Sequence, residues 1–309
     1  MIGQKRVLEQ LDTIIKGSKI NETQLPSFIF CGPRGYGKTT IARLIAKDLG
    51  YKLIEVIGGN ITKPHHLALP IFINAPKQDK KSGNWDKKGL VIFIDEMHSA
   101  DNCALEILYP VIQESMLNLI IGSATKPQVV NVPLHNVIVI GATTNEELLP
   151  KPLVQRMVSI TLDQYTNTEM GEIVCGESKD LTAYQIGKLI PYLRGTPRNA
   201  VQYTRRCAEY LAVHERLDVV EVMTMQGVDE NYLTDKEVKY LKILHFMGGG
   251  PVGLASIASV LDLPKDQVSE NIETYLVQQG FVYRTPQGRT LSESGRVIAV
   301  EYGESGEGE

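Results

Sequence analysis

The chain has 309 residues, an ordinary apolar content and a formal net charge of −4. This length predicts two or three domains, and the charge excludes a protein covered in positive charge, although a local basic feature would suffice to contact nucleic acid phosphates. No apolar run approaches the ~20 residues that cross a bilayer, and the charged N-terminal stretch is not a secretory signal. The four cysteines are spaced for neither a zinc site nor a disulfide scaffold, so we expect reduced thiols in a cytoplasmic protein.

The first 163 residues alternate between short apolar runs and helical patterns. The runs "PSFIFCG", "KLIEVIG", "LVIFIDE" and "NVIVIGATT" are typical of strands buried on both faces of a parallel sheet. Helical stretches such as "TTIARLIAKDLG" lie between them. This alternation predicts an α/β sheet domain over residues 1–163.

A lysine-rich segment, "KQDKKSGNWDKKG", interrupts this domain at residues 77–89. It holds five lysines, two aspartates and the only tryptophan of the chain, Trp85. Such a segment is typical of a solvated loop. A basic finger that touches DNA or a partner is the alternative.

Two further domains follow. Residues 164–232 predict a small helical domain, in which Thr196 is the N-cap of a helix and Pro197 its first residue. Residues 233–303 open with a capping box, Thr234 and Glu237, and continue through two more helices to the hairpin "FVYRTPQGRTLS". Three helices and a hairpin predict a winged helix-turn-helix, and residues 304–309 a disordered acidic tail.

The motif "GPRGYGKT" at 32–39 fits the phosphate-binding P-loop, G-x-x-x-x-G-K-[ST], between a strand and a helix. Its glycines, Gly32, Gly35 and Gly37, let backbone N–H groups surround phosphates. Lys38 would reach the β- and γ-phosphates, and the Thr39 hydroxyl would ligate Mg²⁺. The helix N-terminus adds its dipole, so the motif predicts binding of ATP with Mg²⁺.

Polar residues end two later strands. Asp95 and Glu96 follow "LVIFI", where Asp95 would hold the Mg²⁺ ion and Glu96 would polarise the attacking water. This pair therefore predicts ATP hydrolysis. The strand "VIVIGATTN" ends in Thr143 and Thr144, where a polar side chain can contact the γ-phosphate or the water.

Two arginines have positions that suit nucleotide sensing. An arginine supplied by a neighbouring subunit can raise hydrolysis by about 10³–10⁵-fold, and Arg156 in "PLVQRM" is the candidate. Arg198 in "RGTPRNA" begins a predicted helix and could sense the γ-phosphate. Isolated arginines more often form surface ion pairs, but their order relative to the other motifs favours these roles.

Taken together, the sequence resembles the RuvB family, ring ATPases that drive branch migration of Holliday junctions in bacteria. The resemblance extends from "IGQ" to about Arg296, and its most specific parts are "LYP", "IIG", "RGTPR", "GGGPVGL" and "YLVQQGFVYRTPQGR". It implies an AAA+ P-loop ATPase sheet domain, a helical lid and a winged helix. It also implies a homo-oligomer, with a hexameric ring expected, that acts on double-stranded DNA at four-way junctions.

The resemblance assigns roles residue by residue. It implies that Thr144 is the sensor, Arg156 the arginine finger and Arg198 the lid sensor. The hairpin at 114–134 would dock on a RuvA-like junction-recognition protein. The remaining assignments are nucleotide contacts at Gly37, Lys38, Thr39, Thr40 and Tyr165, catalytic acids at Asp95 and Glu96, and DNA contacts at Arg284 and Arg289.

Several positions depart from the family pattern. An arginine-containing segment usually precedes "IGQ" and lines the adenine pocket, Gln287 stands where the wing has a central arginine, and Asn145 replaces an arginine. The segment 77–89 resembles an insertion. We therefore expect a divergent bacterial or phage-encoded member that binds nucleotide and DNA less tightly.

Two other functions fit the motifs. A clamp-loader-like or initiator-like ATPase would use the same ATP site to remodel a protein partner on DNA, and its rate would respond to that partner rather than to duplex length. The second alternative is a ring subunit that keeps the fold but has lost the ATPase activity. The intact Lys38, Asp95, Glu96 and Arg156 argue against this alternative.

The charge of the third domain bears on how it would bind DNA. Residues 233–303 hold seven Lys and Arg against eight Asp and Glu. A helix that reads bases in the major groove would need the reverse balance. We therefore expect sequence-independent contact with the DNA backbone through Arg284 and Arg289, which would lie close together at the base of a type I turn.

Overall fold

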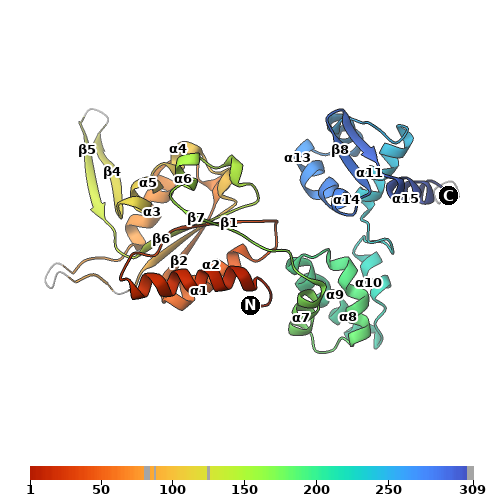
Figure 1. Cartoon of the computed structure of the whole chain (residues 1–309), viewed down its shortest axis with the longest axis horizontal. Coiled ribbons are helices and arrows are strands. Elements are labelled where there is room, and N and C mark those ends of the chain that lie inside the picture. The colour runs from red at the N-terminus through yellow and green to blue at the C-terminus, as the bar shows by residue number, and fades with distance from the viewer. Residues whose placement is uncertain (80–83, 87, 124–125, 305–309) are drawn as a thin grey trace. The chain divides into compact units, whose positions relative to one another are not determined.

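The computed structural model describes residues 1–79, 84–86, 88–123 and 126–304 (Figure 1). The chain forms two compact units by its internal packing. The first unit comprises Met1–Lys179 and Leu193–Gln202, and the second comprises Asp180–Tyr192 and Tyr203–Glu309. The segment 164–232, predicted as one helical domain, thus contributes to both units. No helix in the described part of the chain combines the length and hydrophobicity of a membrane span.

The first unit is built on a five-stranded parallel sheet with the order β2-β3-β6-β1-β7. The α/β prediction is therefore confirmed, and each of the four predicted apolar runs forms a strand. The strands are β1 Phe28–Cys31, β2 Lys52–Ile57, β3 Leu90–Asp95, β6 Val137–Thr143 and β7 Val158–Thr161. The sequence analysis did not predict β7, an edge strand of four residues with two polar side chains.

The sheet is covered on both faces. Helices α1 and α2 lie on one face and α3 to α6 on the other (Figure 1). Side chains alternate between these faces, as period-2 strand geometry requires. Ile29, Ile92 and Val139 pack into the core beneath α3 to α6. The helices are α1 Lys5–Ile20, α2 Lys38–Leu49, α3 His65–Asn74, α4 Asn102–Leu105, α5 Leu108–Gln113 and α6 Lys151–Val154.

A β-hairpin leaves this unit after α5 (Figure 1). Strands β4 Met116–Ser123 and β5 Lys126–Pro133 pair antiparallel, which confirms the hairpin predicted within 114–134. Leu117 is buried at its base. Further out, Ile120 and Val129 face each other across the ladder, with 78% and 69% of their surface exposed.

The lysine-rich segment 77–89 is described only in part, because residues 80–83 and 87 lie outside the described residues. Gln78 and Trp85 form an antiparallel bridge. The Trp85 ring stacks on His135, with 5.4 Å between the ring centroids. The tryptophan is therefore packed against the first unit.

Four helices make up the segment between the sheet and the winged region. Helix α9 begins at Pro197, as predicted. The sequence analysis missed α7, which starts with a capping box of Thr166 and Glu169, and α10, which Asp218 caps. The four helices are α7 Asn167–Glu177, α8 Ala183–Leu193, α9 Pro197–His214 and α10 Val219–Met225.

The C-terminal part of the second unit is a winged helix. The predicted capping box of Thr234 and Glu237 is present at the start of α11. A π-helical segment, Val268–Glu273, joins α13 to α14. The other elements are α11 Asp235–Phe246, α12 Leu254–Leu261, α13 Lys265–Gln267, α14 Thr274–Gln278, β8 Val282–Thr285, β9 Gly288–Leu291 and α15 Glu293–Glu304.

Helix α15 was not predicted, and it corrects the prediction for the tail. Glu304, expected to be disordered, is the last residue of this helix, and residues 305–309 lie outside the described residues. Upstream of it, the hydroxyl of Tyr302 hydrogen bonds to Asp229 and accepts a bond from the side chain of Asn231 at 3.1 Å. These polar contacts anchor the end of α15, although the glycines and acids of the C-terminal sequence had predicted disorder.

The wing is a hairpin with the two-residue loop Pro286-Gln287, and a third segment joins it. Val252 and Arg289 form an antiparallel bridge, with backbone hydrogen bonds of 2.9 and 2.8 Å. Gly288 permits this approach: its φ is +147°, and a Cβ there would lie 2.6 Å from the Val252 carbonyl oxygen. A side chain at position 288 is excluded by both strain and contact.

We predict that Gly288→Ala destabilises the second unit by about 1–3 kcal/mol, because the new Cβ meets strain and backbone atoms together. Thermal unfolding followed by circular dichroism, with hydrogen exchange of β8 and β9, measures the loss. Gly253→Ala is the matched control, since a Cβ there meets nothing within 4 Å and φ is −68°. Equal stability of the two variants would contradict the prediction.

Candidate functional site

A cavity of about 790 Å³ opens at the carboxyl ends of the parallel strands. The P-loop connects β1 to α2 at its floor, and Gly32, Gly35 and Gly37 all have positive φ angles there. The predicted site residues that line the cavity are Gly35, Gly37, Lys38, Thr39, Thr40, Asp95, Glu96, Tyr165 and Arg198. Gly32, Thr144 and Arg156 are not among the lining residues. The fold therefore gathers most of the predicted nucleotide site from four separate segments.

Lys38 is buried at the base of the P-loop, with 6% of its surface exposed. Its Nζ donates to the carbonyl oxygens of Gly32 at 2.7 Å and Pro33 at 3.0 Å. Burial lowers the pKa of Lys38, and the nearby carboxylates of Glu96 and Asp95 oppose this effect. The ammonium group is thus held inside the loop that would surround the phosphates.

The end of β3 directs two carboxylates into the cavity. Glu96 adopts a left-handed backbone conformation with φ of +49°, and its N–H donates to Asp95 Oδ1 at 3.0 Å. The N–H and Oγ of Ser99 both donate to the Glu96 carbonyl oxygen, at 2.9 and 2.7 Å. This tight turn places an acid at each of two consecutive positions on the cavity wall.

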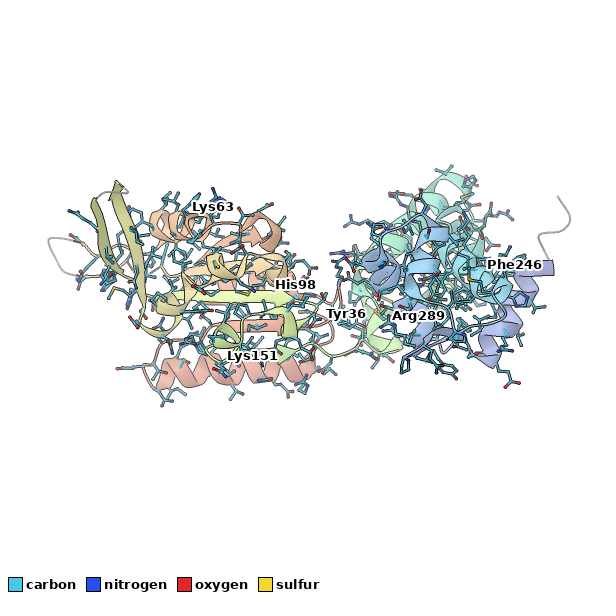
Figure 2. The ribbon with its side chains drawn as sticks, turned by 90° about the horizontal axis from the view of Figure 1, so that it is seen from above. Tyr36, Lys63, His98, Lys151, Phe246 and Arg289 are labelled. Atoms are coloured by element: carbon cyan, nitrogen blue, oxygen red, sulfur yellow. The ribbon has the colours of Figure 1, made fainter. Side chains whose placement is uncertain are left out.

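Two side chains that the sequence analysis did not single out contact the Glu96 carboxylate. Arg34 Nε donates to Glu96 Oε1 at 3.1 Å. His98 Nε2 lies 3.5 Å from Glu96 Oε2. His98 and Tyr36 lie at the end of the first unit where the strands terminate (Figure 2). Arg34 occupies an unspecified position of the P-loop motif, and His98 follows the acidic pair by two residues, so the motifs themselves specify neither contact.

At the tip of β6 the structure involves Thr143 rather than Thr144. Thr143 is fully buried, and its Oγ1 lies 2.8 Å from His98 Nδ1. The same hydroxyl donates to the Asn145 carbonyl oxygen at 2.9 Å. Thr144, the residue predicted as the sensor, is exposed. The role assigned to Thr144 stays a prediction, and Thr143 links this strand end to the turn that carries Glu96.

The two predicted sensor arginines have different surroundings. Arg198 lies in the first turn of α9 and lines the cavity. Arg156 does not line it; its Nη1 donates to the Pro152 carbonyl oxygen at 2.5 Å, and its guanidinium lies 5.1 Å from the ring centroid of Tyr109. Arg156 is therefore not directed at the nucleotide cavity of its own chain.

The N-terminal segment forms another wall of the cavity. Met1 and Ile2 line it beside Tyr165, whose hydroxyl donates to the Tyr36 carbonyl oxygen at 3.2 Å. Gln4 fixes this segment through two hydrogen bonds to the Asp163 backbone, at 2.7 and 2.9 Å. The only sequence signal for this wall was the "IGQ" stretch named by the resemblance.

In the winged helix, Arg284 and Arg289 lie directly opposite each other, as expected, but both contact one buried carboxylate. Arg289 Nε lies 2.6 Å from Glu273 Oε1, and Arg284 Nη2 lies 3.2 Å from Oε2. The Tyr240 hydroxyl donates to Oε1 at 3.2 Å. Glu273 is fully buried, whereas the side chains of Arg289 and Arg284 are 20% and 47% exposed. Arg289 is labelled in Figure 2.

This cluster changes the expectation that Arg284 and Arg289 are equivalent contacts for the DNA backbone. The hydrogen bond that Arg289 donates to Glu273 raises the pKa of Arg289, so this arginine stays charged beside the buried acid. Arg284 is more exposed and also donates to the Ser269 carbonyl oxygen at 3.2 Å. Arg289 thus has a structural role in addition to any DNA contact, and Arg284 is the more available of the two.

The fold and the cavity define an AAA+ P-loop ATPase joined to a winged helix. Residues 1–162 match the family described as "Holliday junction DNA helicase RuvB P-loop domain", and residues 230–298 match "RuvB C-terminal winged helix domain". The chain therefore belongs to the RuvB family, the ATP-hydrolysing motor subunits of Holliday junction branch migration.

Relatives and solved structures agree over the full length. The chain is 31% identical over 306 residues to the Holliday junction branch migration complex subunit RuvB of Mycoplasma genitalium, covering 97% of this chain and 95% of that protein. For the subunit of Rickettsia africae the identity is 34% over 302 residues, covering 94% and 85%. The structure of the Thermotoga maritima RuvB Holliday junction branch migration motor is 30% identical, with a TM-score of 0.76 and coverage of 95% and 93%.

We predict that Arg289→Ala destabilises the winged helix by about 3 kcal/mol, because it removes the closest partner of the fully buried Glu273 carboxylate. Arg284→Ala removes a half-exposed contact, and we expect a loss of at most about 1 kcal/mol. Chemical denaturation of the full chain, with hydrogen exchange of α14 as the local readout, compares the two.

Adding Glu273→Gln to Arg289→Ala tests the cause of this loss. The neutral amide does not need a cationic partner, so we expect the double variant to recover part of the stability. A double variant less stable than Arg289→Ala alone would contradict the role given to the buried charge.

Proposed function

We propose that this chain moves duplex DNA through a four-way junction as one subunit of a homo-oligomeric ring, expected to be a hexamer, with a RuvA-like partner. The observation that carries this proposal is the intact ATP cavity, in which Lys38, Asp95, Glu96 and Arg198 converge on a chain that also carries a winged helix. The relatives named as branch migration complex subunits match it along almost their whole length. We expect it to act in the bacterial cytoplasm.

The cavity supports a defined set of roles toward ATP. Lys38 and the P-loop N–H groups would bind the β- and γ-phosphates, with the α2 N-terminus adding its dipole. The Thr39 hydroxyl and the Asp95 carboxylate are oxygen donors on the cavity wall, which suits Mg²⁺. The described residues contain no group of three His, Cys, Asp or Glu that could hold a metal alone. A Mg²⁺ ion at this site would therefore need phosphate oxygens among its ligands. The ion would supply positive charge that offsets the negative charge developing on the phosphates.

Hydrolysis would depend on Glu96 and on sensing of the γ-phosphate. Glu96 would accept a hydrogen bond from the attacking water and orient it, since its carboxylate lines the cavity. The Thr143–His98 contact would couple the tip of β6 to the turn that positions this carboxylate. Arg198, at the first turn of α9, would respond to the γ-phosphate.

Arg156 would complete the site of a neighbouring subunit. It lies outside the cavity of its own chain and has one carbonyl contact and one aromatic contact, to Pro152 and Tyr109. A cation held by one carbonyl oxygen and one aromatic ring could exchange these contacts for phosphates presented by another subunit. This arrangement favours a ring in which ATP binds between adjacent subunits.

The wing would contact the DNA backbone rather than bases. Helix α13, the π-helical segment and α14 together carry one lysine and three acids, which is unfavourable in a major groove. Arg284, half exposed beside the loop Pro286-Gln287, is the best-placed phosphate ligand. Contacts of this kind position a duplex without selecting a sequence, as a translocating motor requires.

The hairpin β4–β5 would bind the junction-recognition partner. Ile120 and Val129 present adjacent apolar side chains far from the hairpin base, with 78% and 69% of their surface exposed. Exposed apolar pairs on a projecting element favour a protein-binding role. A clamp-loader-like ATPase would also use such a hairpin, so the ATPase response discriminates the two functions. A motor is stimulated by duplex length, whereas a loader is stimulated by its protein partner.

Mixing two inactive variants tests the shared site. Lys38→Ala and Arg156→Ala should each lower ATPase activity by about 10³-fold or more. An equal mixture should regain activity, because about a quarter of the interfaces in a randomly mixed ring combine an intact Lys38 with an intact Arg156. The measurement is steady-state ATPase of the mixed proteins with duplex DNA.

The control for this experiment replaces one partner by the double variant Lys38→Ala with Arg156→Ala. Its mixtures contain no complete interface when combined with either single variant, and no recovery is expected. Absence of recovery in the test mixture, with ring formation verified by light scattering, would exclude Arg156 as the shared residue.

A second test concerns the wing. Arg284→Ala should weaken duplex binding by a similar factor for unrelated sequences and reduce the slope of log affinity against log salt concentration by about 1. Fluorescence anisotropy over a salt series measures both quantities. Arg206→Ala, which removes an i,i+3 ion pair with Glu209 on α9, serves as the control. A loss confined to one DNA sequence would contradict backbone contact.

A further inference from the structure

We propose that Arg34, within the P-loop, is a phosphate-operated switch on Glu96. In this structure its guanidinium pairs with the Glu96 carboxylate, and nucleotide binding would transfer it to the phosphates. Glu96 then becomes available to orient water. This inference rests on the proposed role of Glu96 in hydrolysis and adds a residue that couples phosphate binding to that role.

The geometry of the pair supports a contact that can be exchanged. Arg34 Nε lies 3.1 Å from Glu96 Oε1, and both residues line the nucleotide cavity. The Arg34 side chain is 52% exposed and Glu96 25% exposed. The guanidinium can therefore reorient without unpacking a core, whereas the carboxylate is the more buried of the two groups.

Arg34 bonds only one oxygen of the Glu96 carboxylate in the hydrogen bond described above, and the second oxygen, Oε2, has different surroundings. Glu96 Oε2 is buried and, among the described residues, has no hydrogen-bond partner. His98 Nε2 lies 3.5 Å from this oxygen without a hydrogen bond to it. When a guanidinium bonds one oxygen of a carboxylate, its positive charge offsets part of the negative charge and occupies lone pairs. The carboxylate is then a weaker hydrogen-bond acceptor for a water molecule. Pairing with Arg34 thus suppresses the function proposed for Glu96.

Charge balance in the cavity indicates the direction of the switch. Lys38 and Arg34 bring two cations to one short loop, and both donate hydrogen bonds to protein oxygens. ATP introduces several negative charges between them. A guanidinium binds phosphate through paired N–H groups in a geometry that a single carboxylate oxygen does not provide. Phosphates therefore compete well for Arg34, whereas they repel the Glu96 carboxylate.

The test compares the empty and filled sites directly. The structure of the full-length ring, determined by electron cryomicroscopy with a non-hydrolysable ATP analogue and Mg²⁺, gives the position of Arg34 in filled subunits. We expect the Arg34 guanidinium to lie within hydrogen-bond distance of a phosphate oxygen and to have left Glu96. Arg34 still bonded to Glu96 in filled subunits would overturn the proposal.

Analogue binding in solution provides a second readout that does not depend on hydrolysis. In a Glu96→Gln background, where the carboxylate cannot hold the arginine, Arg34→Ala should weaken binding of the analogue about tenfold, with Arg34→Lys intermediate. Arg206→Ala in the same background is the control and should change affinity less than twofold. Unchanged affinity of the Arg34→Ala variant would exclude Arg34 as a phosphate ligand and overturn the proposal.

These outcomes separate the switch from the proposed function. An analogue that fails to bind the unmodified protein would contradict the ATP site itself. An analogue that binds normally while Arg34 stays on Glu96 would contradict only the switch and leave the motor function intact.

Discussion

Parallel pairing of β3, β6 and β1 is the constraint on which the ATP site depends. The register pairs Cys31 with Thr143 and Ile94 with Gly141, so the three strands end at the same edge of the sheet. The P-loop, the acidic pair and the buried threonine are far apart in sequence, yet this register leaves them no other place to meet. The strands themselves are almost entirely apolar and buried under helices on both faces, and the polar residues of the site lie at their ends.

Local sequence was sufficient for the strands and for the P-loop, because continuous apolar runs and the glycine pattern specify them without distant partners. It was insufficient for β7, whose four residues pair at a sheet edge, and for α15, which buries Ala299 in the winged-helix core and bonds Asp229 through Tyr302. The site divides in the same way. Lys38 and Asp95 sit inside motifs, whereas the Arg34–Glu96 and Gln4–Asp163 contacts join segments 62 and 159 residues apart. Contacts across such separations leave no periodic pattern in the sequence.

The two proposed ligand sites share one electrostatic arrangement. In each, a carboxylate of the protein pairs with an arginine that is suited to phosphate: Glu96 pairs with Arg34 in the cavity, and Glu273 pairs with Arg284 and Arg289 in the wing. Binding of phosphate would then exchange one ion pair for another, so part of the attraction to phosphate would be offset before contact. The near-neutral charge of residues 233–303 has the same effect on a larger scale. Moderate affinity of this kind would suit the proposed motor, because it would release DNA and nucleotide in every cycle.

The bridge between Val252 and Arg289 has a mechanical consequence. Its two backbone hydrogen bonds connect the segment before α12 to the strand that carries Arg289, so the wing is anchored at its middle as well as at its ends. Tension applied to the wing by a duplex would load both bonds together, and bonds loaded in parallel rupture at a higher force than bonds loaded one after another. The hairpin can therefore act as a stiff lever that passes tension to the helices instead of peeling away from them.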